Sequence, residues 1–364
     1  MGKESTAAVV RTPGGEFTFE KVQLDVVRQH EVLVRLEASG VCRTDVMAQY
    51  MMPLPAVVGH EGTGIVEQVG SAVTEFKPGD RVMMSWPSCG ACPSCTVGRP
   101  FLCDQMGALL FSGARPDGSH TVQLDGQWIS SPFFQQSSFA SHAITPANSL
   151  VAAPPDLPAH MLAALTCGLM TGASSVVNAL RAGPGDQLVV FGAGAVGLSA
   201  VMAARLAGVR PIIAVDINDD RLGLALELGA THTFNVARDE IPARVKEIAP
   251  RGLSHAFDTT GMDGSWRIAV QCLGMGGTLG VVHVPSGDTL NFQCTEMIGR
   301  AAQIKFILSG FAVPRAFLPQ MIDWYRQGLF PYDRLITTFD FADINLAFEE
   351  SRSGRAIKPV LLMS

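Results

Sequence analysis

The chain has 364 residues, of which 47% are hydrophobic, and this is enough for two domains of ordinary size with full cores. A net charge of −6 and a pI near 5.8 argue against a nucleic acid or an anionic membrane as partner. The longest uncharged run lies between Asp156 and Arg181, but its proline, histidine and asparagine favour a buried region over a membrane span.

A stretch rich in β-branched residues and turn signals, 7–80, predicts a barrel-like β region. Within it stand Cys42 and, in a Gly-His-Glu-Gly run, His60 and Glu61. Thiolate, imidazole and carboxylate are ligands that zinc accepts. Taken alone, Cys42 also fits a buried small hydrophobe, and His60 fits a core histidine. The zinc interpretation therefore depends on a third ligand further along the chain.

The next segment carries four cysteines with the spacing C-x2-C-x2-C-x7-C, namely Cys89, Cys92, Cys95 and Cys103. Four thiolates in one loop can enclose a zinc ion with no open position, which predicts a structural metal. An iron–sulfur cluster is the rival, but bacterial ferredoxins place the fourth cysteine after three residues and follow it with proline. Unligated thiols are the other alternative. Metal-ligand cysteines fit a reducing compartment, and the first residues show no secretion signal, so we expect a cytoplasmic protein.

A long polar and glycine-rich connection, 105–145, leads to a short helix of small residues predicted at 171–180. Cys167, just before this helix, is a candidate third ligand. The connection contains several aromatic residues that either fill space under a long loop or line a substrate pocket. They are Phe111, Trp128, Phe133, Phe134 and Phe139.

A strand, a glycine turn, a helix and a second strand follow without interruption at 188–216. The turn is the G-x-G-x-x-G run of Gly192, Gly194 and Gly197, which permits close backbone approach to a pyrophosphate at a helix N-terminus. Asp216 ends the second strand, where a carboxylate accepts hydrogen bonds from an adenosine ribose. The same carboxylate repels a 2′-phosphate, so this region favours NAD over NADP. An ordinary tight turn in a buried βα unit is the alternative.

Helices and strands continue to alternate after this point, which predicts a doubly wound parallel sheet. Beyond about residue 306 we expect a helix, a strand, a helix and a final strand. The predicted pairs of helix and strand are 221–228 with 231–234, 241–248 with 255–258, and 265–273 with 277–284; the later elements are 316–326, 335–339, 341–353 and 357–362.

With the Gly-His-Glu run, the four-cysteine loop and the dinucleotide turn in this order, the chain resembles the zinc-containing medium-chain alcohol dehydrogenases over essentially its whole length. The run 191–204 is most similar to the aryl (benzyl) alcohol and geraniol dehydrogenase branch. The resemblance implies a GroES-like β-barrel catalytic domain, 1–168 and 306–364, around a Rossmann NAD-binding domain, 169–305.

The resemblance also implies two zinc ions per subunit, one catalytic and one structural. Cys42, His60 and Cys167 hold the catalytic zinc in the family, and one position stays open for water or alcohol. A zinc ion lowers the pKa of bound water from about 15.7 to about 7, and an alcohol is expected to respond similarly. By the same resemblance Glu61 lies beside the ligands, and Thr44 accepts the alcohol proton.

The resemblance assigns further contacts with NAD. It places Arg43 and Lys358 near the phosphates, Arg221 near the adenosine ribose and Thr171 beside the nicotinamide. Solvated surface positions are the alternative for the three cations. The full set of expected NAD contacts comprises Arg43, Thr171, Gly192, Gly194, Val196, Gly197, Asp216, Ile217, Arg221 and Lys358.

One position departs from the family pattern. Liver-type members carry a histidine five residues after the first zinc cysteine, and it passes the proton to solvent, whereas this chain has Met47. The terminal proton acceptor is therefore left unassigned. An apolar, methionine-rich wall suits a bulky hydrophobic alcohol better than ethanol. The residues expected there are Met47, Tyr50, Met51, Met52 and Trp86, with simple core packing as the alternative for the methionines.

These features together predict an NAD-dependent zinc alcohol dehydrogenase that oxidises primary aromatic or allylic alcohols to aldehydes. A glutathione-dependent formaldehyde dehydrogenase shares every zinc motif and is the first alternative. A non-catalytic protein that binds NAD and zinc is the second. The expected partners are a small alcohol or aldehyde and, from the family, further copies of the chain in a dimer or tetramer.

Overall fold

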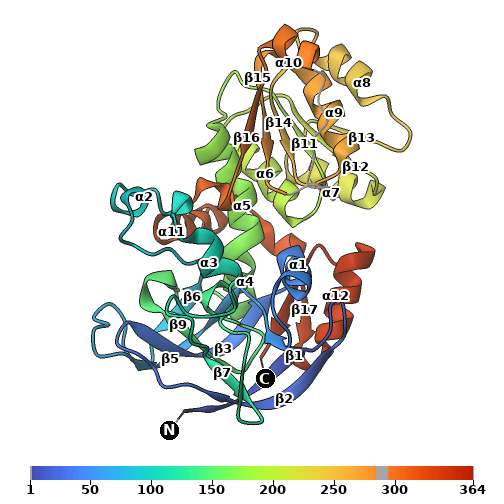
Figure 1. Ribbon diagram of the computed structural model, residues 1–364. Helices are drawn as coiled ribbons and strands as arrows, with labels where there is room; N and C mark the ends of the chain where they lie inside the picture. The colour runs from blue at the N-terminus through green and yellow to red at the C-terminus, as the bar shows by residue number, and fades with distance from the viewer. Residues whose placement is uncertain (1, 284–293, 364) are drawn as a thin grey trace. The chain divides into compact units, whose positions relative to one another are not determined.

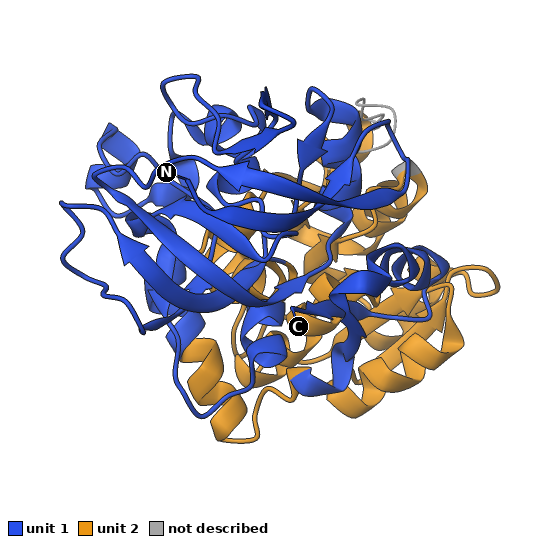
Figure 2. Cartoon of the chain, turned by 90° about the horizontal axis from the view of Figure 1, so that it is seen from below, with its two compact units in different colours: residues 1–167, 313–319, 333–364 blue, residues 168–312, 320–332 orange. Residues whose placement is uncertain are grey.

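A computed structural model describes residues 2–283 and 294–363 of the chain (Figure 1). The chain divides into two compact units, which Figure 2 shows in different colours. The first unit contains Met1–Cys167, Val313–Pro319 and Asp333–Ser364, and the second contains Gly168–Ala312 and Gln320–Tyr332. This division differs from the predicted domain ranges because it assigns Gly168, 306–312 and 320–332 to the second unit.

The first unit is built on two sheets, which confirms the expected β region. One sheet has the order β4-β1-β2-β7-β8, and the other has the order β10-β6-β5-β3-β18-β17, with β9 also paired to β3. Its strands are β1 (Glu4–Val10), β2 (Phe17–Leu24), β3 (Glu31–Gly40), β4 (Ala56–Val57), β5 (Gly62–Val69), β6 (Arg81–Met84), β7 (Val122–Leu124), β8 (Gln127–Ile129), β9 (His142–Pro146), β10 (Leu150–Ala152), β17 (Ile336–Asp340) and β18 (Lys358–Leu362). Its helices are α1 (Arg43–Met51), α2 (Pro93–Thr96), α3 (Met106–Phe111), α4 (Ala159–Ala164) and α12 (Ile344–Ser353).

Strand pairing in the larger sheet brings distant motifs to one place. In the antiparallel pair of β3 and β5, Ser39 lies opposite Gly62. Cys42, which follows β3, and the His60-Glu61 pair, which precedes β5, therefore leave the sheet at adjacent ends. On the other side of β3, Val360 of β18 lies opposite Gly40, so Lys358 at the start of β18 reaches the same end of the sheet.

A buried ion network anchors the long connection 105–145 to this unit. Arg115 is only 4% exposed, and its guanidinium donates to both carboxylate oxygens of Glu31 at 2.6 and 3.1 Å. It also donates to Asp25 at 2.7 Å and to the carbonyl of His120 at 2.7 Å. Burial acts to lower the pKa of Arg115, but the hydrogen bonds and charges of Glu31 and Asp25 raise it above the usual value. The guanidinium therefore stays charged where it is buried.

The second unit contains a parallel sheet of the order β13-β12-β11-β14-β15-β16, which confirms the predicted doubly wound arrangement. Apolar residues of β11, β12, β14 and β15 pack with α8 and α9 in one core cluster, and Figure 1 shows the helices of this unit beside the strands. The strands are β11 (Leu188–Phe191), β12 (Ile212–Asp216), β13 (His232–Asn235), β14 (Leu253–Asp258), β15 (Leu273–Val281) and β16 (Gln303–Phe306). The helices are α5 (Met170–Ser174), α6 (Ala195–Leu206), α7 (Asp219–Leu228), α8 (Ile241–Ile248), α9 (Asp263–Cys272), α10 (Cys294–Arg300) and α11 (Pro314–Arg326), the last of which continues into both units. Val284, the predicted end of the fifth strand, lies outside the described residues.

Helical structure begins earlier than expected before the dinucleotide turn. The prediction started the helix at residue 171, but the observed helical segment runs over Ala159–Leu180, and Cys167 lies in its π-helical turn Leu165–Leu169. Such turns occur frequently at functional sites. This segment is long and apolar enough to cross a membrane by length and composition, but 78% of its most apolar window is buried within the protein.

Candidate functional site

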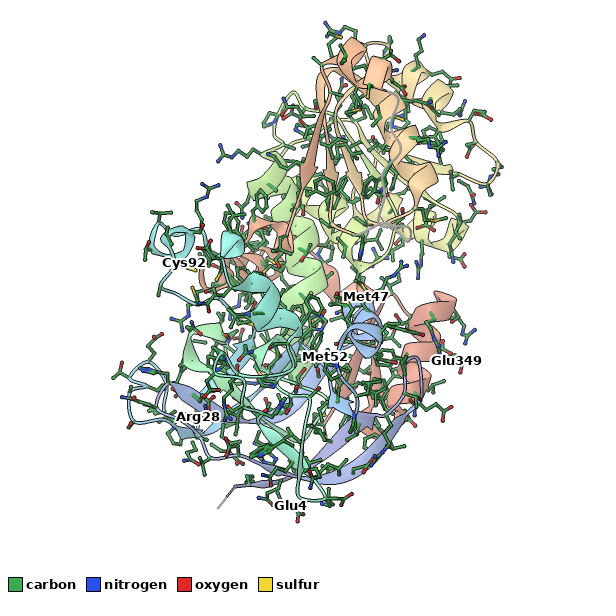
Figure 3. All side chains as sticks on the ribbon, in the orientation of Figure 1. Glu4, Arg28, Met47, Met52, Cys92 and Glu349 are labelled. Carbon is green, nitrogen blue, oxygen red and sulfur yellow. The ribbon has the colours of Figure 1, made fainter. Side chains whose placement is uncertain are left out.

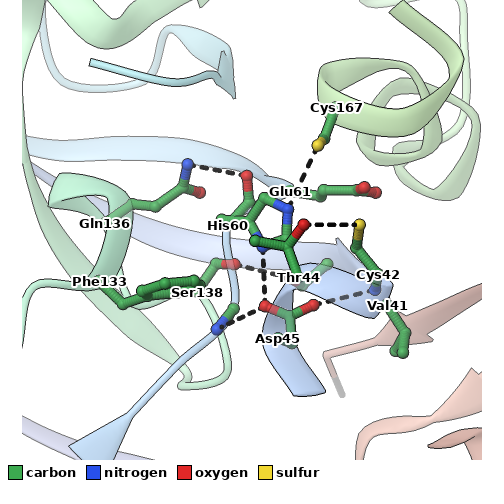
Figure 4. Close-up of polar contacts among 12 residues, drawn as sticks. Val41, Cys42, Thr44, Asp45, His60, Glu61, Phe133, Gln136, Ser138 and Cys167 are labelled. Carbon is green, nitrogen blue, oxygen red and sulfur yellow. Dashed lines mark hydrogen bonds and ion pairs between the residues drawn. The ribbon is translucent and has the colours of Figure 1, made fainter. Parts of the chain in front are cut away.

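Four potential metal ligands converge in the first unit (Figure 4). The ligand atoms of Cys42, His60, Glu61 and Cys167 all lie within 4.8 Å of one another. Cys42 is the residue before α1, His60 and Glu61 precede β5, and Cys167 lies in the π-helical turn after α4. The structure thus brings together the three predicted zinc ligands and the glutamate expected beside them.

The geometry of this cluster fits a zinc ion. Nε2 of His60 lies 3.3 Å from Sγ of Cys167. A nitrogen and a sulfur bound to one tetrahedral zinc are expected about 3.6 Å apart, given bond lengths of roughly 2.0 and 2.3 Å. Oε1 of Glu61 is buried and has no hydrogen-bond partner in the described part of the chain. This oxygen, the two cysteine sulfurs and the imidazole nitrogen together form a set of donors that suits a cation.

Asp45, which the sequence analysis did not select, orients the imidazole. It is fully buried in the first turn of α1, and its Oδ1 lies 2.7 Å from Nδ1 of His60. The same carboxylate accepts from the backbone amides of Cys42 at 2.9 Å and Gly59 at 3.2 Å. A carboxylate on Nδ1 leaves Nε2 free to bind a metal. An acidic residue three positions after the residue that precedes a helix is the signal that could have identified it.

The charges of the cluster are strongly coupled. Burial acts to lower the pKa of His60, but the Asp45 carboxylate and the Cys42 sulfur raise it well above the usual value. The pKa of Cys42 is lowered by a hydrogen bond with Cys167 and by the nearby His60, although burial acts to raise it. The pKa of Cys167 is raised by the same hydrogen bond and by burial. The His60 imidazole and the Cys42 sulfur therefore favour each other's charged forms. Zinc binds thiolates, so its binding would favour the thiolate forms of both cysteines.

Lys358 occupies a different environment from a surface cation. It is 2% exposed, and its ammonium group forms an ion pair with Oε2 of Glu61. Burial raises the pKa of Glu61 to about 7, partly offset by the Lys358 charge. Burial acts to lower the pKa of Lys358, but the Glu61 charge raises it above the usual value. Its expected contact with cofactor phosphates stays a prediction, as does that of the exposed Arg43.

The remaining residues expected near the substrate occupy varied environments. Oγ1 of Thr44 lies 3.6 Å from Sγ of Cys42, so this hydroxyl is beside the metal cluster. Met47 is half-buried and Met52 is buried; both are labelled in Figure 3. Tyr50 and Met51 are 66% and 57% exposed, and Tyr50 borders a cavity of about 250 Å³ lined by α1, α12 and the turn between β1 and β2.

Trp86 is almost completely buried, and its indole N–H has no hydrogen-bond partner among the described residues. The roles of Met47, Tyr50, Met51 and Trp86 in substrate binding stay predictions.

The four cysteines of the loop 89–103 form the second cluster, and Figure 3 labels Cys92 in this loop. Their sulfurs lie within 4.8 Å of one another, and the sulfurs of Cys89 and Cys95 are 3.9 Å apart. Two thiolates on one tetrahedral zinc are expected about 3.8 Å apart. Backbone amides donate to the sulfurs of Cys89 and Cys103, each at 3.3 Å, as they do to thiolates. This loop therefore fits a closed zinc site.

The glycine turn of the second unit has the tight backbone predicted for a dinucleotide site. Gly192 has a φ of +95°, and a side chain at Gly197 would collide with the carbonyl of Gly192. Gly194 immediately precedes α6, so the amides of that helix start face the turn. Asp216 accepts from the Ala193 amide at 2.6 Å, which places its carboxylate against the turn.

Other expected NAD contacts lie in the same unit. Ile217 is 73% exposed beside Asp216, and Thr171 is half-buried in α5. The backbone amide of Arg221 donates to the side chain of Asn218, which caps α7. Val196 lies in the first turn of α6. Their contacts with a cofactor stay predictions.

Comparisons with known proteins agree with these observations. The family described as "Alcohol dehydrogenase GroES-like domain" matches residues 28–155, and that described as "Zinc-binding dehydrogenase" matches residues 195–327. The chain is 41% identical to a geraniol dehydrogenase of Castellaniella defragrans, over 98% of this chain and 97% of that protein. It is 32% identical to an S-(hydroxymethyl)glutathione dehydrogenase of Paracoccus denitrificans, over 98% and 99% of the two chains. A crystal structure of benzyl alcohol dehydrogenase from Acinetobacter calcoaceticus matches with a TM-score of 0.95 and 38% identity over 100% of both chains.

Proposed function

Because the chain belongs to the zinc-containing medium-chain alcohol dehydrogenase family, we propose that it oxidises primary aromatic or allylic alcohols to aldehydes with NAD. The convergence of Cys42, His60 and Cys167 carries the proposal, because it supplies three protein ligands for a tetrahedral zinc whose fourth position would take an alcohol oxygen. The similarity to geraniol and benzyl alcohol dehydrogenases supports the substrate class.

The residues around the cluster have separable tasks in such a reaction. Zinc, when bound, would supply the Lewis acidity that lowers the pKa of the alcohol, and a bound NAD would supply the hydride acceptor. Thr44, beside Cys42, accepts the hydroxyl proton. Asp45 keeps the His60 ring in one orientation. The thioether of Met47 cannot carry a proton, so the proton leaves Thr44 by another group.

The proposal includes two zinc ions per subunit and a homo-oligomer, a dimer or tetramer, in the cytoplasm. The closed geometry of Cys89, Cys92, Cys95 and Cys103 supports the second zinc. An exposed edge strand, β16, with Phe306 60% exposed, supports self-association.

A glutathione-dependent formaldehyde dehydrogenase is the second candidate, because the Paracoccus denitrificans relative is similar over nearly the whole chain. Both candidates use the same zinc ligands, so only the substrate distinguishes them. A non-catalytic protein is disfavoured by the complete ligand set of Cys42, His60 and Cys167.

NAD reduction tests the proposal with four substrates: benzyl alcohol, geraniol, ethanol, and formaldehyde with glutathione, each with and without a zinc chelator. We expect kcat/KM for benzyl alcohol or geraniol to exceed that for ethanol by about 10–100-fold, because additional apolar surface is buried. The chelator should abolish turnover. Highest activity with ethanol or the glutathione adduct would contradict the substrate class but not the family. Binding of NAD and zinc without any turnover would contradict catalysis.

Replacement of Asp216 by Asn tests the choice of cofactor. Loss of a charged hydrogen-bond acceptor costs about 1.5–3 kcal/mol. We therefore expect the ratio of kcat/KM for NAD to that for NADP to fall by roughly 10–100-fold. Asp219→Asn is the matched control, because Asp219 is an exposed acid in the same connection and is paired with Arg238. An unchanged ratio in Asp216→Asn would rule out ribose recognition by this carboxylate.

A further inference from the structure

The segment Phe133–Ser137, which packs against the metal cluster, has an unusual backbone. Phe134, Gln135 and Ser137 adopt φ values of 49°, 53° and 52°, although none of them is glycine. Such left-handed conformations are unfavourable for residues with a side chain and persist only where surrounding contacts require them. All five residues of the segment are buried, with exposures of 0–6%. The contacts that hold this backbone therefore indicate which neighbouring residues the segment supports.

The first contact is a carboxamide bridge across the His60-Glu61 pair. Nε2 of Gln136 donates to the backbone carbonyl of His60 at 2.9 Å, and Oε1 of Gln136 accepts from the Gly62 amide at 3.2 Å. The two ends of one side chain thus hold the backbone on both sides of Glu61. Figure 4 shows Gln136 reaching the His60 backbone from the side opposite Asp45.

The second contact is an aromatic surface for the imidazole. The Phe134 ring lies 4.5 Å from the His60 ring at an interplanar angle of 39°, and Phe133 meets the same ring edge-on at 5.6 Å. Phe111 packs on the Phe134 ring at 5.6 Å and on the Phe133 ring at 5.9 Å. The left-handed backbone at Phe134 places its ring against the imidazole rather than along the loop.

The third set of contacts consists of hydrogen bonds to the backbone at and after the end of β4. Oγ of Ser137 donates to the carbonyl of Val57 at 2.6 Å, and the Ser138 amide donates to the carbonyl of Gly59 at 2.9 Å. Gly59 approaches the loop so closely that a Cβ there would lie 2.6 Å from the Phe139 amide. The segment and the adjacent Ser138 therefore contact the backbone at several points between Val57 and Gly62, the stretch that contains His60.

We propose that Gln136 and Phe134 are positioning residues that hold the backbone and imidazole of His60 in the orientation that the catalytic metal requires. Asp45 fixes the ring at Nδ1, Gln136 fixes the backbone, and Phe134 restricts rotation of the ring. The inference rests on the proposed zinc site of Cys42, His60 and Cys167. It gives a reason for the strained backbone that loop packing alone does not supply.

The neighbouring Gln135 provides a matched control. It is as buried as Gln136, whose Nε2 donates to the carbonyls of His60 at 2.9 Å and Ser85 at 3.4 Å. Nε2 of Gln135 likewise donates to two carbonyls, those of Leu109 at 3.2 Å and Ala114 at 2.8 Å. Neither acceptor belongs to the metal cluster. Substitution of either glutamine by methionine keeps the side-chain length while it removes the hydrogen bonds. A purely structural role predicts equal effects of the two substitutions on metal binding.

The test is the rate at which a colorimetric chelator removes zinc from the purified holoenzyme, with Cys167→Ser used to identify the catalytic zinc. We expect Gln136→Met to release that zinc about 10–100-fold faster than the unmodified protein, the usual effect of losing a residue that orients a ligand. Gln135→Met should stay within about twofold. Equal release rates in the two variants would overturn the proposal. Absence of zinc from this site in the unmodified protein would overturn the proposal and the proposed function together.

A second measurement remains decisive if Gln136→Met does not fold. In cobalt-substituted enzyme, Phe134→Leu should shift the visible absorption of Co²⁺ at the catalytic site, whereas Phe111→Leu should leave it unchanged. Phe111 is the control because its ring packs on the same aromatic pair, at 5.9 and 5.6 Å, whereas the rings that pack on His60 are those of Phe133 and Phe134. Identical spectra for Phe134→Leu and the unmodified protein would contradict the positioning role of the ring.

Discussion

Replacement of Cys167 by Ser is expected to lower kcat/KM for alcohol oxidation by at least about 10³-fold while NAD still binds. In the proposed zinc site Cys167 is one of three protein ligands, and its sulfur lies 3.3 Å from Nε2 of His60. The Lewis acidity of zinc contributes several kcal/mol to such reactions, and roughly 4 kcal/mol corresponds to about 10³-fold in rate. Zinc content should fall by one ion per subunit, measured by elemental analysis beside the kinetics.

Cys294→Ser is the matched control for this substitution. Cys294 is exposed in α10 and belongs to neither cysteine cluster, so its replacement should leave turnover and zinc content unchanged. Undiminished turnover in Cys167→Ser would remove Cys167 from the ligand set. Loss of both zinc ions in that variant would instead indicate that the two sites are not independent.

Replacement of Arg115 by Met is expected to lower the free energy of unfolding of the first unit by about 3–5 kcal/mol. Arg115 is paired with Glu31 and Asp25, and its removal leaves the 9% exposed Glu31 without a counter-charge. Breaking a buried pair on one side is costly because the remaining charge stays desolvated. Denaturation with urea, followed by tryptophan fluorescence, measures the change.

Arg28→Met is the comparison for this prediction. Arg28 pairs with Asp117 at 2.6 Å, but the two side chains are 39% and 58% exposed. Exposed pairs contribute about 0–1 kcal/mol, so the control should change stability little. Removal of Glu31 as well, in Arg115→Met with Glu31→Gln, should recover part of the loss. Equal destabilisation by Arg115→Met and Arg28→Met would show that the buried network carries no special stabilisation.

Motifs with short internal spacing could be predicted from the sequence alone. Cys89, Cys92, Cys95 and Cys103 fall in one loop, so their spacing already limits the geometry they can form. The glycine turn and Asp216 belong to one βα unit, and the predicted strands on both sides are observed at Leu188–Phe191 and Ile212–Asp216. Local chain geometry determines both features, and this is why sequence reasoning was sufficient.

Features that depend on tertiary packing could not be predicted in this way. Gln136 lies 76 residues from His60, and only the folded loop brings its carboxamide to that backbone. Arg115 belongs to no sequence motif of the connection 105–145. Its pairing with Glu31 depends on the folded position of β3. Lys358 was assigned from the family alone, and its pairing with Glu61 follows from strand pairing that no local pattern encodes.

The helix before the dinucleotide turn shows a conflict between local propensity and packing. Gly168 and Gly172 each weaken a helix by about 1 kcal/mol, so local propensity disfavours a continuous helix over Ala159–Leu180. In the structure, a Cβ at Gly172 would lie 2.0 Å from the carbonyl of Val196 in α6, so the close approach of α5 and α6 requires a glycine there. Close helix packing therefore requires glycine at position 172, although glycine disfavours the helix locally.

The pairing of β3 with β18 has a consequence for how the protein is made. Domains form as their residues leave the ribosome, at about 5–20 residues per second, and β3 emerges tens of seconds before β18. The residues of the second unit up to Ala312 are all synthesised in that interval. Until β18 arrives, residues 38–40 of β3 lack their neighbour on one edge, and Glu61 lacks the ammonium group of Lys358. Nascent chains stalled within this interval would carry the strands of the second unit, while the end of β3 still lacks the strand that brings Lys358 to Glu61.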